Sequence, residues 1–268
     1  MTTLLTVLLA CYLLGGVLPL CTSRPSLQNI LAHSSGALAG GTGIALGLGG
    51  LFASHPLTLS IPSNIPYLTF ALRLDPLAAF FVLTISLVGL AVSIYAYGYV
   101  REFTGRVSVG LLGSLLNGFL LSMTLVILAD NGFFFLIVWE LMSLLSYVLV
   151  VTEHERPGVR EAGLFYLIMT HAGTAFIILT FLLFSQETGS FSFEAFRHPD
   201  QRLPEGLRSI AFFTALIGFG AKAGIVPLHV WLPYAHPAAP SHISALMSGV
   251  MIKTAIYGLI RVYFDFLE

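Results

Sequence analysis

Charged residues are scarce in this sequence. Only 9% of the 268 residues are Asp, Glu, Lys or Arg, whereas 56% are hydrophobic and the mean hydropathy is +0.90. A soluble protein of this size needs far more polar side chains to cover its surface. The formal net charge is -1 and no block of basic residues occurs, so nothing indicates a nucleic-acid partner. The sequence therefore predicts a protein that lies in a lipid bilayer.

Cysteine is nearly absent, since Cys11 and Cys21 are the only two. Both lie at the first hydrophobic stretch, and neither belongs to a CxxC pair or a Cys/His cluster of the kind that holds zinc, haem or an iron-sulfur cluster. No two histidines have the HxxxH spacing of a metal site on a helix. The sequence therefore predicts no metal and no cofactor, and any redox centre would belong to another subunit.

Long apolar segments fill most of the chain. A helix of about 20 mostly apolar residues crosses the hydrocarbon core of a bilayer, because it satisfies its own backbone groups. The first such run, at 2–20, lacks the charged start and the cleavage site of a signal peptide, so we interpret it as a retained helix. We predict an all-α polytopic membrane protein with about eight transmembrane helices, near residues 2–20, 34–53, 75–98, 108–128, 131–151, 161–184, 208–236 and 242–263.

Two connecting segments differ from the rest. Residues 57–74 are rich in β-branched and aromatic residues around Pro62, which predicts a short extracytoplasmic hairpin. Residues 186–207 form the only long polar loop. An N-terminus outside the cytoplasm satisfies the positive-inside rule, although the arginines of the long loop weaken this assignment. The arginines then on the cytoplasmic side are Arg24, Arg101, Arg106, Arg156 and Arg160.

Three charged residues lie inside predicted spans. Glu140 and Lys253 lie near the middle of the fifth and eighth spans, and Lys222 lies in the seventh. A charge at such depth costs from about 2.5 to more than 10 kcal/mol, so it normally faces a partner or a hydrated cavity. The other arginines and acids fall in loops or at span ends, where we expect them to be solvated. Glu140, Lys222 and Lys253 are therefore the candidate functional residues, and no residue is predicted to be catalytic.

One acid and two lysines can form a proton relay. Burial and neighbouring charges shift the protonation of each group, and a lysine can lose its proton where an arginine cannot. We expect Glu140 to pair with Lys222 and, when neutralised, to let the proton move towards Lys253. The alternative is a pair that locks two helices together. The second lysine favours the relay, because two cations with one counter-charge form a poor lock.

The histidines form two groups. His171 lies inside the sixth span, and His229, His236 and His242 lie beside the seventh and eighth. Each is a possible member of the relay, with a structural hydrogen bond as the alternative. The remaining histidines lie in loops or at their margins, and we expect them to be solvated: His33, His55, His154 and His198.

The seventh span carries its own interruption. Gly218, Gly220 and Gly224 precede Pro227, and Pro233 follows. Proline removes a backbone donor and clashes with the preceding turn. We predict a break at Gly224 and Pro227, with a simple proline kink as the alternative. A broken helix at membrane depth requires protein or a watery cavity to satisfy its free carbonyls.

Three strings carry a family resemblance: RLDPLAAFF (73–81), VWELMSLLSY (138–147) and the segment 218–258. They resemble the antiporter-like membrane subunits of respiratory complex I, Mrp-type cation antiporters and group 4 hydrogenases. AHPAAPSHISALMSGVMIKT, with VVTEHE at 150–155, is most similar to the component B type of hydrogenase-4 and formate hydrogenlyase. In that family the residues matching Glu140 and Lys222 form the proton-controlling pair, and the residue matching Lys253 is the central relay.

The resemblance also implies a domain organisation. Residues 1–107 would form an N-terminal three-helix segment with the hairpin, and residues 108–268 the first antiporter-type repeat, made of helices four to eight. Family members usually carry a second, inverted copy of this five-helix repeat, which is absent from this sequence. A truncated product, a fragment and half of a split subunit each fit this difference.

We expect a subunit that translocates H⁺, or Na⁺ in its place, in a redox-driven complex of the cell inner membrane. Its partners would be other membrane subunits of a hydrogenase or complex I-like assembly, and it would be a transporter component rather than an enzyme by itself. Two alternatives stay open. One is a subunit of an Mrp-type monovalent cation/proton antiporter, and the other is a membrane scaffold without a complete ion path.

Overall fold

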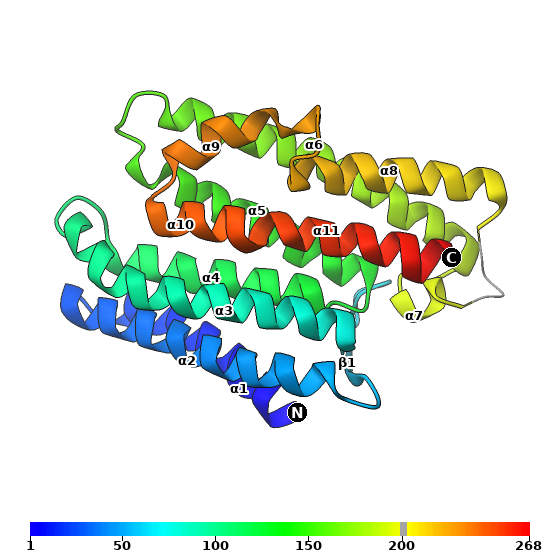
Figure 1. Ribbon diagram of the computed structural model, residues 1–268, viewed down its shortest axis with the longest axis horizontal. Helices are drawn as coiled ribbons and strands as arrows, with labels where there is room; N and C mark the ends of the chain where they lie inside the picture. Colours follow the sequence, from blue (N-terminus) through cyan, green and yellow to red (C-terminus); the bar gives the residue numbers. More distant parts are fainter. Residues whose placement is uncertain (199–202) are drawn as a thin grey trace.

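The computed structural model describes residues 1–198 and 203–268 as a bundle of long helices that lie side by side along one axis (Figure 1). The first half holds α1 (Thr2–Val17), η1 (Leu18–Cys21), α2 (Pro25–Leu51), β1 (Leu57–Pro62), β2 (Thr69–Leu74), α3 (Pro76–Tyr99), η2 (Val100–Phe103) and α4 (Val109–Leu128). The second half holds α5 (Gly132–Val150), η3 (Val151–Glu153), α6 (Val159–Thr188), α7 (Phe193–Phe196), α8 (Glu205–Ala223), η5 (Leu228–Trp231), α9 (Leu232–Ala238), α10 (Ser241–Leu246), η6 (Met247–Met251), α11 (Ile252–Ile260) and η7 (Arg261–Leu267).

Seven helical segments of the described chain are long and apolar enough to cross a membrane. They correspond to seven of the eight predicted spans, which confirms an all-α polytopic membrane fold. The remaining predicted span, 34–53, overlaps α2, which begins nine residues earlier at Pro25 and ends two residues earlier at Leu51. This helix is as long as its neighbours, but its many glycines and serines keep its hydropathy below theirs.

The glycines of α2 explain its place in the bundle. A Cβ added to any of five of them would come within 3 Å of an atom of α3, so only glycine allows this approach. Such small-residue faces are typical of helices that pack inside membranes. The five contacts are Gly36 with Ser93, Gly40 with Leu90, Gly43 with Ser86, Gly47 with Leu83 and Gly50 with Ala79.

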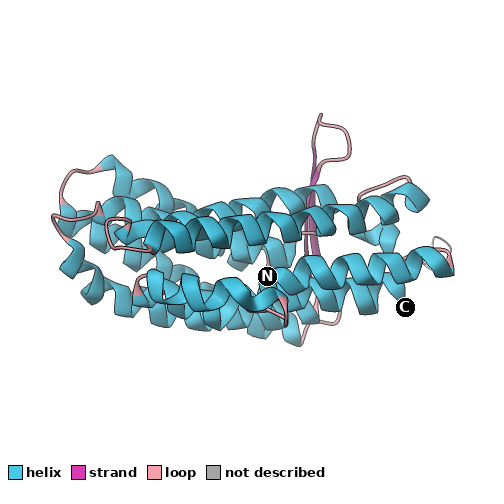
Figure 2. Cartoon of the chain, turned by 90° about the horizontal axis from the view of Figure 1, so that it is seen from above, coloured by secondary structure: helices cyan, strands magenta, loops and turns pink. Residues whose placement is uncertain are grey.

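The predicted hairpin is confirmed. Strands β1 and β2 pair antiparallel with Leu57 opposite Leu74, and they stand across the direction of the helices at one end of the bundle (Figure 2). The backbone nitrogen of Asp130 donates to Ala71 O at 2.9 Å, which ties the hairpin to the α4–α5 junction. We call this the hairpin end. The opposite end, where α2 begins and α3 ends, carries Arg24, Arg101, Arg106, Arg156 and Arg160, and we call it the arginine-rich end.

The loop of residues 186–207 is more ordered than a plain polar loop. It contains α7, whose Phe193 and Phe196 are buried against Phe181 and Phe184 of α6. The nitrogen of Phe193 donates to Asp130 O at 3.1 Å, so this segment also belongs to the hairpin end. The polar residues around Phe193 and Phe196 gave no indication in the sequence that these two rings are buried. Residues 199–202 of the loop lie outside the described part of the chain.

The seventh span breaks rather than kinks. Helix α8 ends at Ala223, and Gly224 adopts a left-handed conformation with φ of 74°. A Cβ at Gly224 would lie 2.4 Å from Leu232, so glycine is required there for space as well as for conformation. After Pro227 the chain continues as η5 and α9. The eighth span is continuous but contains the π-helical stretch η6 just before Lys253.

Candidate functional site

Lys222 lies in the last turn of α8, directly before the break. The break leaves carbonyls of α8 without helical partners, and the protein satisfies them: Trp231 Nε1 donates to Ala221 O at 2.8 Å, and the nitrogen of Ile225 donates to Gly220 O at 3.0 Å. A cation at a helix C-terminus is also favoured by the helix dipole. The break therefore places a lysine at a helix end where its charge is stabilised.

The Lys222 ammonium is enclosed by neutral groups. Nζ donates to Ser143 Oγ at 2.9 Å and to Tyr166 OH at 2.8 Å, and the residue is 1% exposed. It also lies 5.1 Å from the centre of the Tyr166 ring and 5.9 Å from that of Trp139, within the range of cation–π attraction. Tyr166 OH is shared with Ser146 Oγ at 2.6 Å. The ammonium group thus donates to two hydroxyl oxygens and faces two aromatic rings, but no carboxylate is in direct contact with it.

Glu140 pairs with His171 and not with Lys222. Its Oε2 lies 3.0 Å from His171 Nε2, and their side chains are 30% and 44% exposed. In the described chain no ion pair within 4.0 Å joins Glu140 to Lys222, so the predicted direct pair is wrong. The sequence gives the depth of Glu140 in α5 but not the direction in which its side chain points. The carboxylate remains close enough to interact electrostatically with Lys222 and Tyr166.

The contact between Glu140 and His171 is made by one carboxylate oxygen and one ring nitrogen, which can share a proton. His171 Nδ1 bonds to Leu167 O at 2.9 Å, and a carbonyl only accepts, so Nδ1 carries a hydrogen. Nε2 then faces Glu140 in one of two ways: as the donor of an imidazolium to a carboxylate, or as the acceptor from a protonated carboxyl. Both arrangements place one proton between the two residues. His171 is thereby brought to the site, as a partner of the acid.

Lys253 lies apart from this group. Its side chain is exposed on the surface of the chain, and Nζ donates to Ser248 O, a carbonyl of the π-helical stretch η6. The adjacent Thr254 is buried and bonds to Met142 of α5 at 3.7 Å. The structure therefore places the two lysines of the chain in opposite settings, one enclosed and one open.

The three remaining candidate histidines occupy different positions. His236 Nδ1 bonds to Ser244 Oγ at 3.1 Å, and its ring stacks 6.4 Å from Trp231, which in turn packs 4.9 Å from Tyr166. His236 thus adjoins the Lys222 site through two rings. His229 is half-buried, and its Nδ1 is buried without a partner in the described chain. His242 is 1% exposed and packs on Tyr99, on the side of α3.

Residue-by-residue inspection of the sequence missed the direct partners of Lys222. Ser143 follows Glu140 by three residues, so a helical face shared by both was a signal. Tyr166 gave a weaker one, as a phenol in the middle of the sixth span. His33 was also misjudged: it was expected to be solvated but is 3% exposed within α2, because this helix begins well before the apolar run used to place it.

A second charged cluster lies at the hairpin end. Arg261 donates to Asp75, to Asp265 at 2.5 Å and to Tyr257 OH at 2.9 Å, and it is 7% exposed. Arg197 bonds to Asp130 at 2.8 Å and lies 3.6 Å from Asp265. The expectation that such span-end charges are solvated is wrong for Arg261, because Asp75, Asp265 and Tyr257 surround its guanidinium group.

The carboxyl of Asp75 shows the effect of this cluster. Burial alone would raise the pKa of Asp75, but the hydrogen bond and the charge of Arg261 outweigh it and lower the pKa below its ordinary value. Asp75 also caps α3 by accepting from the nitrogen of Ala78 at 2.9 Å. This acid therefore stays ionised and fixes the start of a transmembrane helix.

Within residues 1–198 and 203–268, no three His, Cys, Asp or Glu side chains are grouped so that they could hold a metal ion. The chemistry that the described site supports is proton binding and transfer among Glu140, His171, Lys222 and Tyr166.

Comparison with known proteins gives a consistent picture. Residues 129–268, which are 140 of the 268, match the family described as NADH:quinone oxidoreductase/Mrp antiporter, transmembrane. Residues 63–106 match the family described as NADH-ubiquinone oxidoreductase (complex I), chain 5 N-terminus. The second match begins in the hairpin and the first contains Glu140, Lys222 and Lys253.

Two curated relatives come from Escherichia coli (strain K12). Hydrogenase-4 component B is 42% identical over 86% of this chain and 34% of its own length. Formate hydrogenlyase subunit 3 is 26% identical over 88% of this chain and 36% of its own length. The chain thus spans about a third of these relatives. A chain of the membrane-bound sulfane sulfur reductase, an archaeal respiratory membrane complex, shares the fold with a TM-score of 0.82 at 18% identity, over 99% of this chain and 53% of that one.

Proposed function

The chain belongs to the family of NADH:quinone oxidoreductase and Mrp antiporter membrane subunits, and from this premise we propose that it translocates H⁺ or Na⁺ as a subunit of a redox-driven complex. The complex is of the hydrogenase-4 or formate hydrogenlyase type, or a complex I-like NADH:quinone oxidoreductase, in the cell inner membrane. Its partners are other membrane subunits of that assembly, and the redox centres belong to other subunits. The similarity to hydrogenase-4 component B supports the first type.

One observation carries the proposal: Lys222 is 1% exposed, and its ammonium has only hydroxyl partners. A buried lysine that served as a structural lock would be paired with a carboxylate, because an unpaired buried charge is unfavourable. Neutral partners stabilise both the charged and the neutral amine. Lys222 can therefore bind and release a proton without leaving an unpaired acid behind.

The protonation of the Glu140–His171 pair controls this step. When Glu140 is ionised and His171 is neutral, the pair carries a net negative charge and stabilises a protonated Lys222. When one more proton binds to the pair, its net charge becomes zero, burial then favours the uncharged amine, and Lys222 releases its proton. The Glu140–His171 pair acts as the switch, Lys222 as the carrier, and Lys253 as the next station. His236, which adjoins the site through Trp231 and Tyr166, is a further proton-accepting group.

Replacement of Lys222 tests the proposal in the assembled complex in membrane vesicles. Lys222→Met removes the proton-binding group at similar volume, and Lys222→Arg keeps a charge that cannot be lost. We expect both variants to lower proton translocation per electron at least tenfold, measured by the quenching of a pH-sensitive dye. Electron transfer and assembly are measured in parallel, and Ser209→Ala, at an exposed serine of α8, serves as the control.

Unchanged translocation in Lys222→Met would refute the relay. Retained translocation in Lys222→Arg alone would show that the charge, and not its loss, is required. Proton movement driven by a Na⁺ gradient without an electron donor would identify the chain as an Mrp-type antiporter subunit instead.

A further inference from the structure

Buried polar atoms without protein partners gather among α1, α2, α3 and α4. They include atoms of Tyr12, His33, Ser93 and Asn117, which are 0%, 3%, 1% and 1% exposed. The Tyr12 hydroxyl, both ring nitrogens of His33, Ser93 Oγ and Asn117 Oδ1 lack a hydrogen-bond partner in the described chain. Buried polar atoms are normally bonded, to protein or to ordered water.

Glycines let these atoms approach the helix backbones closely. Asn117 Oδ1 lies 2.5 Å from the position that a Cβ would take at Gly15 and 3.2 Å from that at Gly36. Ser93 Oγ lies 2.6 Å from the same position at Gly36. Asn117 Nδ2 donates to Ala32 O at 3.0 Å, which orients the amide and turns its oxygen towards the glycines. Polar atoms of α3 and α4 thus converge on the glycines of α1 and α2.

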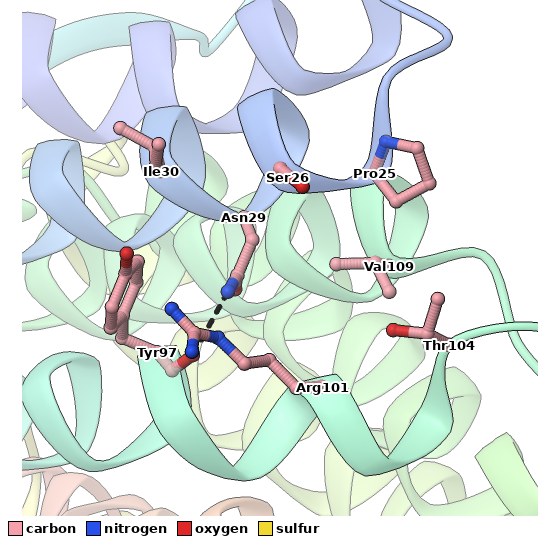
Figure 3. A pocket seen from close by; sticks show the side chains of 8 residues that line it. All are labelled: Pro25, Ser26, Asn29, Ile30, Tyr97, Arg101, Thr104 and Val109. Atoms are coloured by element: carbon pink, nitrogen blue, oxygen red, sulfur yellow. Dashed lines mark hydrogen bonds between the residues drawn. The ribbon is translucent and has the colours of Figure 1, made fainter.

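This cluster continues to the arginine-rich end through Asn29. Asn29 is 4% exposed, and its Nδ2 donates to Tyr97 O at 2.9 Å, which leaves Oδ1 buried and without a partner. It lines a cavity of about 460 Å³ together with Ser26, Arg101 and Thr104, and Figure 3 shows these residues and the hydrogen bond from Asn29 to Tyr97 O. Oδ1 is an acceptor, so it requires a donor such as water.

The spacing along α2 joins the two regions. Asn29, His33 and Gly36 follow at intervals of four and three residues, so they share one face of the helix. A second cavity of about 440 Å³ is lined by His33 and Ser93, and it shares Ile30 and Tyr97 with the first. From the start of α2 to Gly36 the helix rises by about 16 Å, roughly half of the hydrocarbon thickness.

We propose that Asn29, His33, Ser93, Asn117 and Tyr12 bind a file of water molecules that opens at the cavity beside Arg101, and that His33 exchanges protons with this file. The file lies among α1 to α4 and is separate from the Lys222 site. Water supplies each unpartnered acceptor with a donor and each hydroxyl with an acceptor. An imidazole can take a proton on one nitrogen and release it from the other, so His33 suits a place in a water chain.

Thiol accessibility tests the water file independently of transport. Cys11 and Cys21 are first replaced by Ser, and single cysteines are introduced by Ser93→Cys and by Ser122→Cys in membrane vesicles. Ser122 is the matched control, since it is 0% exposed but its Oγ is bonded to Phe119 O at 2.8 Å. We expect Ag⁺ applied at the arginine-rich end to react with the cysteine at position 93 at least tenfold faster. Equal rates at the two positions would overturn the file.

A second variant tests whether water reaches Ser93 from the cavity beside Arg101. Asn29→Leu removes the acceptor at the cavity and fills the space next to His33. We expect it to slow the reaction of Ag⁺ with the cysteine at position 93 at least fivefold, without changing the rate at position 122. An unchanged rate at position 93 would show that water reaches Ser93 by another path, and the proposed opening beside Arg101 would be wrong.

The proton exchange at His33 rests on the proposed function and has its own test. His33→Gln keeps a polar side chain but cannot pass a proton, and we expect it to lower proton translocation about threefold or more in the assembled complex. His55→Gln, at an exposed histidine, is the control. Full translocation in His33→Gln would overturn the proton role. If Lys222→Met also translocates normally while position 93 reacts, the proposed function fails and the water file stands.

Discussion

Buried charges have different partners at the hairpin end and in the middle of the bundle. At the hairpin end, Arg261 is 7% exposed and bonds to the carboxylates of Asp75 and Asp265. In the middle, Lys222 is 1% exposed and bonds to two hydroxyls. A charge paired with carboxylates is held in one protonation state, whereas a lysine among neutral groups can change its state. The partner of a buried charge, more than its burial, separates a structural role from a role in proton transfer.

The largest effect is expected from breaking the paired cluster. Arg261→Met leaves the partly buried Asp75 and Asp265 without their main counter-charge, and loss of one partner from a buried ion pair costs about 3–5 kcal/mol. We expect a decrease of this size in the free energy of unfolding, measured by denaturant titration in mixed micelles. Arg24→Met, at an exposed arginine of the opposite end, should change it by less than about 0.5 kcal/mol. Similar values for both variants would contradict a structural role for the cluster.

A smaller effect is expected from acid. The pKa of Asp75 is lower in the folded protein than its ordinary value of 3.8, so its contribution to stability is complete above that value and is lost as the pH falls through the lowered one. Asp75→Asn removes this contribution at every pH. We therefore expect the stability difference between the native protein and Asp75→Asn to be constant from pH 7 to 5 and to shrink below about pH 4. A difference that stays constant to pH 3 would contradict the link to Asp75.

An exposed ion pair should contribute still less to the free energy of unfolding. Arg156 lies 2.7 Å from Glu153, with side chains 53% and 30% exposed. Exposed ion pairs contribute about 0–1 kcal/mol and are screened by salt. Arg156→Ala should lower the free energy of unfolding by less than about 1 kcal/mol, and by less still at high salt. A loss equal to that in Arg261→Met would show that pairing in water and pairing in the bundle have the same strength here.

The sequence predicted how deep residues lie in the bilayer, but not the direction in which their side chains point. Hydropathy placed the spans, the hairpin and the buried position of Lys222, and the Gly224–Pro227 pattern predicted the break, because each depends on local composition or backbone chemistry. The partner of Glu140 could not be found in this way, since a choice between His171 and Lys222 depends on how α5, α6 and α8 are rotated. Arg261 was misjudged for the same reason: its partner Asp75 lies 186 residues earlier in the chain.

The smallest effect on stability is expected at the residue with the largest expected effect on transport. Lys222→Met leaves no polar atom stranded, because Ser143 Oγ still donates to Trp139 O at 3.1 Å and Tyr166 OH still bonds to Ser146 at 2.6 Å. Replacing a buried cation by an apolar side chain of similar length is often neutral or stabilising, so we expect a loss of less than about 0.5 kcal/mol in the same unfolding assay. A loss of more than about 2 kcal/mol would identify Lys222 as a structural lock, since only a charge that holds helices together destabilises to that extent when removed.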